Sequence, residues 1–275
     1  MLRWGLIGFG RAGCARARAI QACERSELVA GLRGAVADFG LTPSPGVAAL
    51  IERVDAVAIC SPTDSHAAYA AQALQAGRHV VCEYPLAADR QGAQALFDLA
   101  DRHQRVLHVE HIELLAATQQ ALATSLEATE VLGGRLIDRR GSPGPDPLDL
   151  LARLHRLVQL LGLADGVSPQ ALRFGTVAIE LDVGLSGPGR PATRQLTLRT
   201  PRGVLALQGR QVTLDGQPVP LPATPGLFAQ DHAVATARIL DGAPSYVSRG
   251  RILNVLGLVD ALSGSAWVSR PDHRS

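Results

Sequence analysis

The sequence has 275 residues and a formal net charge of only +2 at pH 7, which argues against nucleic-acid binding. With 47% hydrophobic and 19% charged residues, it has the composition of a globular protein with a sizeable core, in one large or two ordinary domains. No apolar run is long enough to span a bilayer. The sequence contains no lysine, so all 27 basic side chains are arginine, which binds anions well but carries protons poorly.

Cysteine usage indicates a reducing compartment. The four cysteines, Cys14, Cys23, Cys60 and Cys82, lie in the first third of the chain and form no C-x-x-C pair. The sequence shows neither a signal peptide nor a membrane anchor. We therefore expect reduced thiols in a cytoplasmic protein that does not bind a membrane.

The glycine-rich segment GFGRAG lies between a predicted strand and a predicted helix near the start of the sequence. In that position, G-x-G-x-x-G predicts a dinucleotide-binding turn. Gly8 permits the tight turn, Gly10 lets a pyrophosphate approach the backbone, and Gly13 lets the helix pack closely on the sheet. Arg11 and Ala12 belong to the same turn, where N–H groups at the start of the helix would bind the phosphates.

Strands and helices alternate along the first half. Strands are predicted at residues 2–7, 27–32, 54–62, 78–85 and 105–111, and helices at 14–23, 63–77 and 90–104. This spacing predicts a doubly wound parallel sheet of the Rossmann type, which binds ligands at the carboxyl ends of its strands. Beyond the glycines, the candidate site residues at those ends are Arg33, Ser61, Pro62, His66, Glu83, Tyr84, Glu110 and His111.

The end of the second predicted strand indicates which nicotinamide cofactor is used. Enzymes that use NAD usually carry an acidic residue there, which binds the ribose 2′-hydroxyl. This sequence reads Leu32-Arg33-Gly34 and has no carboxylate before Asp38. Since Arg33 suits a 2′-phosphate, we predict NADPH rather than NADH; the alternative is a solvated arginine in a loop.

The second half has a different pattern. Its predicted elements are helices at residues 114–126, 148–162, 230–240 and 249–266, a strand at 133–141, a proline-rich loop at 142–147, and antiparallel strands within 171–221. Asp215-Gly216 is the best hairpin signal among those strands. We therefore expect an NADP-binding domain at residues 1–113 and an α+β domain with a mainly antiparallel sheet at 114–275, which binds the substrate. The final helices could pack back on the first domain.

The order of the motifs resembles that of a known family. GFGRAG, CSPTDSH and AGRHVVCEYPLA follow one another as in the Gfo/Idh/MocA oxidoreductases. Most of that family carry Glu-Lys-Pro where this sequence has Glu83-Tyr84-Pro85, and many carry an Asp-x-x-x-His pair at the positions of Leu148 and Ala152. The resemblance implies an NAD(P)-dependent oxidoreductase that lacks the family's machinery for oxidising sugars.

The biliverdin reductase branch of this family departs from the pattern in the same way. The sequence resembles that branch over GFGRAG, AICSPTDSHAAY, HVEHIELL, ARLHRLVQLLG and RGRILNVLGLVDAL. The resemblance implies that NADPH delivers hydride to the central methine carbon of a linear tetrapyrrole, biliverdin, while a pyrrole nitrogen gains a proton. Such a reduction needs orientation and charge stabilisation more than a strong base. The implied protein is a monomer or a weak homo-oligomer with a small-molecule substrate.

The resemblance also implies roles for two arginines on the helix at 148–162. Arg153 and Arg156 are three residues apart, so both can point the same way. Arg153 would be a catalytic group near the bilin nitrogens, and Arg156 would bind a propionate in bidentate fashion. The alternative is two solvated arginines on an amphipathic helix.

Residues at the strand ends would complete the site. Tyr84 is the second catalytic candidate: it could donate a hydrogen bond to the bilin or simply fill the space beside the nicotinamide, and an unperturbed phenol is a slow acid at neutral pH. Glu83 would help to seat the nicotinamide. Glu110 and His111 are assigned to substrate binding, although a structural role for His111 beside Glu110 is favoured.

Two other functions stay open. The protein could be another Gfo/Idh/MocA reductase that acts on a sugar or an imine, or a non-catalytic sensor that binds a bilin or a nucleotide. No Cys/His spacing predicts a metal site, and no Ser–His–Asp order predicts a hydrolase.

Overall fold

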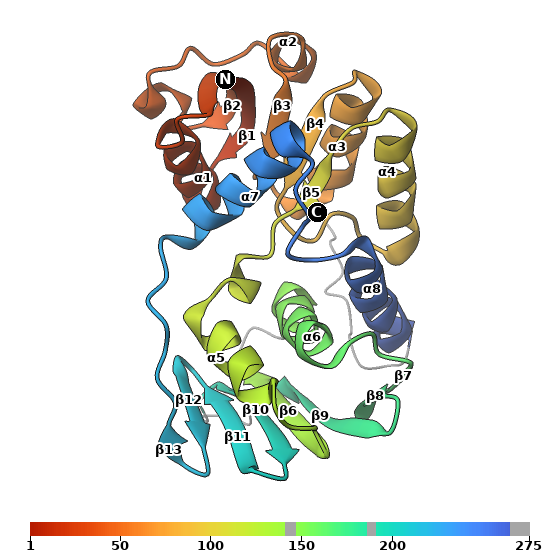
Figure 1. Ribbon diagram of the computed structural model, residues 1–275. Coiled ribbons are helices and arrows are strands. Elements are labelled where there is room, and N and C mark those ends of the chain that lie inside the picture. Colours follow the sequence, from red (N-terminus) through yellow and green to blue (C-terminus); the bar gives the residue numbers. More distant parts are fainter. Residues whose placement is uncertain (141–146, 186–190, 265–275) are drawn as a thin grey trace. The chain divides into compact units, whose positions relative to one another are not determined.

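The structure, a computed structural model, describes residues 1–140, 147–185 and 191–264 (Figure 1). It divides into two compact units. Unit 1 comprises Met1–Leu115 and Pro225–Arg249, and unit 2 comprises Ala116–Thr224 and Gly250–Ser275. The chain therefore leaves unit 1 near the predicted domain boundary and returns to it with the segment Pro225–Arg249.

The centre of unit 1 is a five-stranded parallel sheet with the order β2-β1-β3-β4-β5. Its strands are β1 (Leu2–Phe9), β2 (Ser26–Gly34), β3 (Ala56–Ile59), β4 (His79–Cys82) and β5 (Leu107–Val109). Pro43 forms one parallel bridge to Gly31 of β2. With this remnant of a sixth strand, the order is that of a complete Rossmann sheet. The predicted doubly wound parallel sheet is confirmed.

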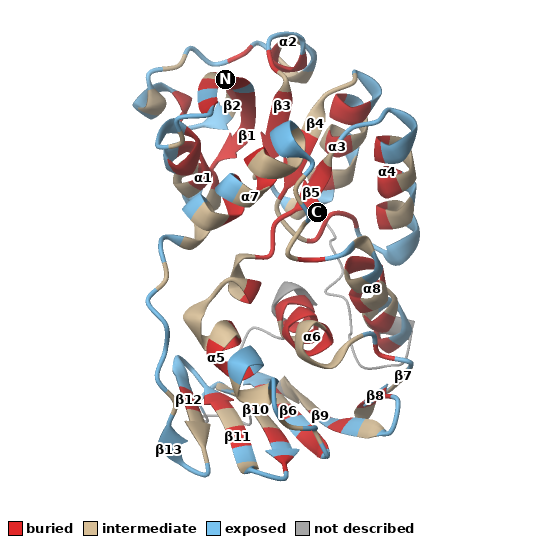
Figure 2. Cartoon of the chain, in the orientation of Figure 1, coloured by how far each residue is buried: buried red, intermediate tan, exposed pale blue. Residues whose placement is uncertain are grey.

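Helices cover both faces of this sheet, so its strands are buried on both sides (Figure 2). The helices are α1 (Arg11–Gln21), α2 (Val47–Glu52), α3 (His66–Gln75), α4 (Arg90–Arg102) and α7 (Leu227–Asp241), with 3-10 turns η1 (Val36–Phe39), η2 (Thr63–Ser65) and η3 (Ile112–Leu114). Helices α1 and α7 pack together on one face, where Ile20 and Ala235 share a core cluster with Trp4 and Leu6. Helix α3 packs against α2 and α4.

Unit 2 is built on an eight-stranded sheet with the order β13-β12-β11-β10-β6-β9-β8-β7. The strands are β6 (Gly133–Arg140), β7 (Gly166–Ser168), β8 (Ala171–Phe174), β9 (Val177–Leu185), β10 (Thr193–Thr200), β11 (Gly203–Gln208), β12 (Gln211–Leu214) and β13 (Gln217–Pro218). Neighbouring strands are antiparallel except β6 and β9, which are parallel. The predicted mainly antiparallel sheet is confirmed.

The hairpin between β12 and β13 turns at the predicted residues. Asp215 has φ 47° and Gly216 has φ 78°, so both central residues adopt the left-handed conformation that a tight two-residue hairpin turn requires. The Asp-Gly signal is therefore confirmed.

One face of the unit 2 sheet carries a row of leucines. The strand register aligns Leu181 of β9, Leu136 of β6, Leu196 of β10 and Leu207 of β11 in neighbouring strands. Helices α5 (Ala117–Leu126) and α6 (Pro147–Leu161) lie over the sheet in Figure 1, and α5 contacts α6, β11 and β12. A further helix, α8 (Arg249–Gly264), confirms the predicted last helix as far as Gly264. The predicted end of that helix lies outside the described residues, as does nearly all of the predicted loop at 142–147.

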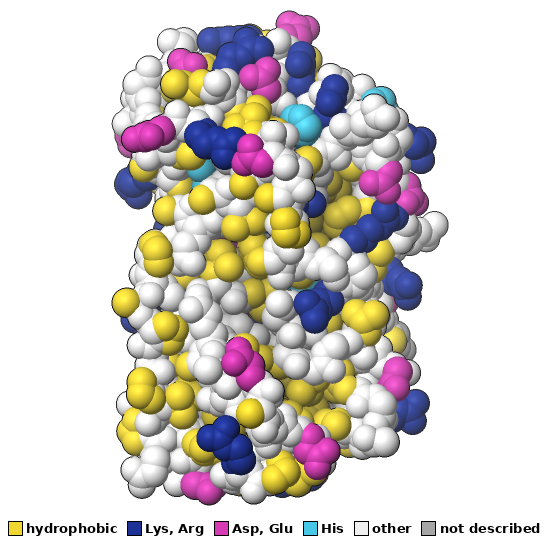
Figure 3. All heavy atoms as spheres, viewed as in Figure 1, with side chains coloured by type: hydrophobic (Ala, Val, Ile, Leu, Met, Phe, Trp, Pro, Cys, Tyr) yellow, Lys and Arg dark blue, Asp and Glu magenta, His cyan; other side chains and the backbone are white. Residues whose placement is uncertain are grey.

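No helix within the described ranges has both the length and the apolar character that a membrane crossing requires. Figure 3 shows arginine and carboxylate side chains interspersed on the face in view rather than gathered into a patch of one sign.

Candidate functional site

The glycine-rich turn between β1 and α1 is shaped by close backbone contacts. Gly8 has φ +97°, and a Cβ there would lie 2.6 Å from the carbonyl oxygen of Cys60. A Cβ on Gly13 would lie 1.8 Å from the carbonyl oxygen of Gly8. A Cβ on Gly10 would meet no protein atom within 4 Å. Gly8 and Gly13 are thus required by packing, whereas Gly10 leaves open space in front of α1.

That open space lies at the N-terminus of a helix. Gly10 is the N-cap of α1, no side chain caps the helix, and its first turn has no acidic residue. The N–H groups of Arg11, Ala12 and Gly13 have no partner within the helix, because the first turn lacks preceding carbonyls. The helix N-terminus therefore suits an anion, and the turn fits the pyrophosphate of a dinucleotide.

Arg33 lies near this turn, at the carboxyl end of β2. The register pairs Phe9 with Gly34, which brings the end of β2 beside the start of the glycine-rich turn. Arg33 is exposed, has φ 65°, and its guanidinium stacks over the ring of Tyr69 at 5.5 Å from the ring centre. A cation in this place can bind a phosphate on the adenosine ribose.

The ends of β3 and β4 are joined by a buried histidine. One ring nitrogen of His66 lies 2.7 Å from the carbonyl oxygen of Ser61, and the other lies 2.9 Å from that of Pro85. The Ser61 hydroxyl is 2.7 Å from that of Ser65, while Pro62 is exposed at the start of η2. His66 therefore fixes the two loops; Ser61 beside it is buried, and Pro62 is exposed.

Tyr84, directly after β4 and Glu83, stacks on His111, which follows β5. The ring centres are 5.3 Å apart and the planes differ by 12°. His111 is fully buried, and one ring nitrogen lies 3.1 Å from the Val109 carbonyl oxygen. Burial lowers the pKa of His111 to about 4, so the ring is neutral at pH 7. The neutral imidazole is a flat support for the tyrosine.

A buried cluster of charged groups lies behind these strand ends. Arg16 of α1 is 1% exposed, and its Nη1 lies 2.5 Å from Oδ2 of Asp231, which is fully buried. Asp231 Oδ1 accepts a hydrogen bond from the Tyr246 hydroxyl at 2.6 Å and lies 2.8 Å from His108 Nε2. Burial opposes ionisation of Asp231, yet Arg16, His108 and Tyr246 together hold its pKa below the usual range.

The same cluster reaches two carboxyl groups at the strand ends. Arg16 Nη2 lies 3.5 Å from Oε1 of Glu83, which is partly exposed. Glu110 is 1% exposed and accepts a hydrogen bond from the Ile112 N–H at 2.8 Å. Burial, followed by the charge of Glu83 and a hydrogen bond with it, raises the pKa of Glu110 well above the usual range. Burial and the neighbouring carboxylate thus favour the protonated form of Glu110.

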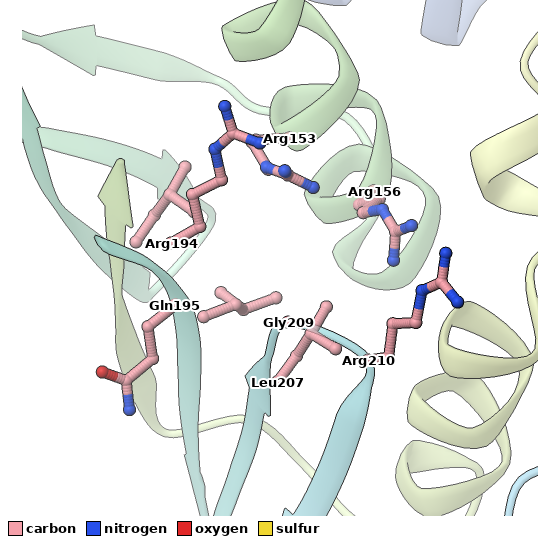
Figure 4. Close-up of a pocket in the computed structure, with 9 residues that line it drawn as sticks. Arg153, Arg156, Arg194, Gln195, Leu207, Gly209 and Arg210 are labelled. Atoms are coloured by element: carbon pink, nitrogen blue, oxygen red, sulfur yellow. The ribbon is translucent and has the colours of Figure 1, made fainter. Parts of the chain in front are cut away.

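Unit 2 contains a pocket of about 250 Å³ between α6 and the sheet (Figure 4). Four of its lining residues are arginines: Arg153, Arg156, Arg194 and Arg210. Its apolar wall is formed by Leu136, Leu196 and Leu207 from the row of leucines. The pocket therefore combines an apolar surface with several guanidinium groups, a combination that suits an apolar molecule with anionic substituents.

The arginines come from two sides of the pocket. Arg156 of α6 is 9% exposed, and its Nη1 donates a hydrogen bond to Thr118 Oγ1 at 3.3 Å. Figure 4 shows Arg210, from the turn after β11, directed towards Arg156, and Arg194 of β10 directed towards Arg153. The Nε atom of Arg153 is buried and has no hydrogen-bond partner within the described parts of the chain. The two arginines predicted on this helix thus line one pocket.

Sequence analysis did not identify Arg194, Arg210 or the buried residues Arg16 and Asp231. The register places Arg194 opposite Asp138, and the two side chains approach to 3.7 Å. Alternation along β10 could have placed Arg194 on the same face as Leu196, since the two are separated by one residue. No local signal in the sequence links Arg16 to Asp231, and none places Arg210 in the pocket. Across the described residues, no group of three His, Cys, Asp or Glu side chains is arranged to hold a metal ion.

Comparison with known proteins gives matches over both units. An oxidoreductase family with an NAD-binding Rossmann fold matches residues 2–111. Human biliverdin reductase A is 28% identical over 94% of this chain and 93% of its own length. UDP-N-acetylglucosamine 3-dehydrogenase from Acidithiobacillus ferrooxidans is 35% identical over 41% of this chain and 37% of its own. The crystal structure of a biliverdin reductase from Synechocystis sp., in complex with biliverdin and NADP+, has a TM-score of 0.84 and 29% identity, and the match covers 96% of this chain and 98% of that one.

Proposed function

We propose that this chain, whose residues 2–111 match an oxidoreductase family with an NAD-binding Rossmann fold, reduces biliverdin to bilirubin with NADPH. The observation that carries the proposal is the four-arginine pocket of unit 2. Biliverdin is a flat apolar chromophore with two propionates and two lactam oxygens. It therefore needs both an apolar wall and several cations, and this pocket offers both.

The residues around Tyr84 favour this reaction over the oxidation of a sugar. Removing hydrogen from a sugar alcohol needs a base beside the hydroxyl group. The chain has Tyr84 where much of the family carries lysine, and it has no lysine elsewhere. On α6, Ala152 occupies one of the two positions where many relatives carry a catalytic pair. The likeness to two biliverdin reductases over nearly the whole chain supports the same choice.

NADPH would bind at the carboxyl edge of the unit 1 sheet and supply the hydride when bound. Gly8, Gly10 and Gly13, with the N–H groups of Arg11 and Ala12, would hold the pyrophosphate. Arg33 would bind the 2′-phosphate, and Glu83 would seat the nicotinamide. Ser61 and Pro62 would line the same edge, with His66 fixing their loop from behind.

The bilin would be bound chiefly through guanidinium groups. Arg156 would hold one propionate, and Arg210, which is directed towards it, would share that carboxylate or bind the second one. Arg153 would stabilise the charge that develops on the lactam and pyrrole system during hydride transfer. Tyr84, supported by His111, would donate a hydrogen bond to the bilin. Glu110 would help to bind the bilin beside them.

The reaction consumes one hydride and one proton. The hydride forms a C–H bond at the central methine carbon, and a proton forms an N–H bond at a pyrrole nitrogen. The products are bilirubin and NADP+, with one NADPH oxidised for each bilin reduced. Binding and orientation provide most of the catalysis, because the conjugated bilin accepts hydride without prior removal of a proton.

The test is turnover by the purified protein with NADPH and biliverdin, at neutral and at mildly acid pH. The red absorption of biliverdin should fall, a band in the blue should appear, and NADPH loss should equal bilin loss. Arg153→Ala should lower kcat about a hundredfold, since one charge-stabilising group contributes on this scale. Arg210→Ala should raise KM for biliverdin about tenfold or more, the effect of one lost charge-assisted contact.

Arg173→Ala is the matched control, because Arg173 is an exposed arginine of β8 that lies outside the pocket and pairs with Asp165. It should leave both constants unchanged. Binding of NADPH without any change in biliverdin at either pH would contradict the proposal. A shift of the bilin spectrum without NADPH oxidation would indicate a sensor instead.

A further inference from the structure

An arginine and a tyrosine of unit 1 meet across the end of a strand that lies between them. Arg33 is near the end of β2, and Tyr69 is on α3, which follows β3. Strand β1 separates β2 from β3 in the sheet. The guanidinium carbon of Arg33 nevertheless lies over the Tyr69 ring, 5.5 Å from its centre. The contact therefore spans the carboxyl end of β1, where the glycine-rich turn begins.

The register of the sheet sets the position of Arg33. Gly34 pairs with Phe9 at the end of β1. Arg33, one residue earlier, therefore lies level with Gly8 in the glycine-rich turn. The N–H groups at the start of α1 follow this turn and would hold the pyrophosphate in the proposed function. The 2′-phosphate of NADPH is carried by the ribose next to that pyrophosphate, so a cation beside the turn is placed to recognise it.

The backbone of Arg33 has an unusual conformation. Its φ is 65°, in the left-handed region that residues with a Cβ seldom adopt. In the described part of the chain, the other such residues besides glycine are Gln104 and Asp215. A left-handed residue departs from the alternation that directs side chains to the two faces of a strand. The Arg33 side chain is thus released from that alternation, and its guanidinium ends over the ring of Tyr69.

Tyr69 holds the guanidinium without cancelling its charge. An aromatic face attracts a cation through its quadrupole and carries no net negative charge. A carboxylate partner would instead neutralise the cation and compete with an anionic ligand. No carboxylate of the described residues forms an ion pair with Arg33. The ring therefore leaves the full positive charge of Arg33 for a phosphate.

The support from Tyr69 also limits the freedom of an exposed side chain. Arg33 is exposed, and a long side chain in solvent samples many rotamers that a bound phosphate must restrict. Tyr69 is half-buried on a helix whose first residue, His66, lies within hydrogen-bond distance of two loop carbonyl oxygens. Contact with this fixed ring orders the guanidinium before the ligand arrives, and such preorganisation strengthens binding.

We propose that Tyr69 is a positioning residue for cofactor selection: its ring holds the guanidinium of Arg33 where the 2′-phosphate of NADPH binds, and this favours NADPH over NADH. The inference rests on the proposed function, in which Arg33 binds that phosphate. Selectivity then belongs to two residues from separate elements rather than to Arg33 alone. The ring carries the role, because the Tyr69 hydroxyl makes no hydrogen bond to a described residue.

The test compares four ligands in the unchanged protein and in Tyr69→Leu. NADPH and adenosine 2′,5′-bisphosphate carry the 2′-phosphate, whereas NADH and adenosine 5′-phosphate lack it. Titration of nicotinamide fluorescence, with competition by the two adenosine ligands, gives each Kd. Loss of one exposed cation–π contact should weaken binding of the two 2′-phosphorylated ligands about threefold. The other two ligands should bind as they do to the unchanged protein.

Two further variants separate the ring from the hydroxyl and from general packing. Tyr69→Phe keeps the aromatic face and should bind all four ligands like the unchanged protein. Phe97→Leu is the matched control, because the ring of Phe97 on α4 contacts Arg249 at 5.2 Å from the ring centre. It removes the same kind of contact elsewhere in unit 1 and should leave the four affinities unchanged. A loss in Tyr69→Phe as large as that in Tyr69→Leu would overturn the inference.

A double-mutant cycle shows whether Tyr69 acts through Arg33. Arg33→Gln removes the cation, so adding Tyr69→Leu to it should cause no further loss of NADPH affinity. The same loss with and without Arg33 would overturn the inference. An equal weakening of all four ligands by Tyr69→Leu, or no weakening of any, would overturn it as well.

None of these measurements uses biliverdin. Failure of the cycle would therefore overturn the inference and leave the proposed reduction intact. If the protein selects the 2′-phosphate through Tyr69 but does not reduce biliverdin, the inference stands and the proposed reduction alone fails.

Discussion

Arg33 is the side chain on which the preference for NADPH depends. It lies at the end of β2, where the register places it beside the glycine-rich turn, and its guanidinium stacks on Tyr69. A guanidinium held flat in this way can bind a phosphate in bidentate fashion.

Arg33→Gln should weaken NADPH binding about tenfold to a hundredfold, because one charge-assisted contact is lost, and should leave NADH binding nearly unchanged. Titration of cofactor fluorescence measures both dissociation constants. Arg33→Lys is the control: it keeps the charge and should retain part of the preference. An equal loss of affinity for both cofactors would show that Arg33 does not bind the 2′-phosphate.

At the residue scale, local motifs were predictable and long-range partners were not. The glycine turn is marked by residues within one short segment, and Arg153 and Arg156 share one helix, so spacing alone places them together. Arg194 and Arg210 reach the same pocket from β10 and the turn after β11. Their approach depends on strand order and helix packing, which a single sequence does not specify.

Helix α7 is held to the unit 1 sheet by a buried histidine. His232 contacts the ring of Trp4 edge-on at 5.0 Å between ring centres, and its Nε2 lies 2.9 Å from the Ser26 hydroxyl. Burial, and then the charge of Arg16, lower the pKa of His232 to about 3. The ring is therefore neutral in the folded protein over the whole physiological range.

This histidine should make the stability of unit 1 depend on pH. Between its unfolded pKa of about 6.5 and its folded pKa of about 3, the unfolded chain binds a proton at His232 and the folded chain does not. The free energy of unfolding that His232 contributes is thus fully present above about pH 6.5 and falls as the pH is lowered.

Urea unfolding at about pH 7.5 and about pH 5 measures the effect. His232→Gln should be less stable than the unchanged protein at the higher pH, and the gap should narrow by about 2 kcal/mol at the lower one. A gap that stays constant or widens on acidification would show that His232 is not held neutral by its surroundings.

At the element scale, most helices and strands followed from periodicity; the short elements α2 and β7 were not predicted, and the other differences lie mainly at the ends of elements. The first helix was predicted from Cys14, but α1 begins at Arg11 because Gly10 is its N-cap and Gly13 lies in its first turn. A glycine is needed there because a Cβ on Gly13 would lie 1.8 Å from the carbonyl oxygen of Gly8, which local propensity does not reveal. Strand β3 is shorter than predicted, at Ala56–Ile59, because the chain turns into the Ser61 loop.

At the scale of the whole molecule, the chain crosses between its units more than once. The pattern of the second half predicted its helices and antiparallel strands, and it left open that the final helices pack back on the first domain; of these, α7 lies within the segment Pro225–Arg249 of unit 1. Helix α7 joins unit 1 through Ala235 and His232, which contact the core around Trp4. The parallel pairing of β6 with β9 was also unforeseen, since the two strands are separated in sequence by α6 and two short strands.

The proposed reaction needs a cofactor and a substrate. Unit 1 offers the edge of a Rossmann sheet for the cofactor, and unit 2 offers the four-arginine pocket. The proposal requires that hydride pass directly from the nicotinamide to the methine carbon of a bilin bound by that pocket. If the transferred hydrogen is deuterium, direct transfer of this kind places the deuterium in the product.

Turnover with NADPH that carries deuterium on one face of the nicotinamide C4 tests this requirement most directly. For one of the two labelled faces, mass spectrometry should find one deuterium in each bilirubin, at the central bridging carbon, and the other face should give unlabelled product. Loss of the deuterium to solvent with both labels, or no bilirubin at all, would contradict the account.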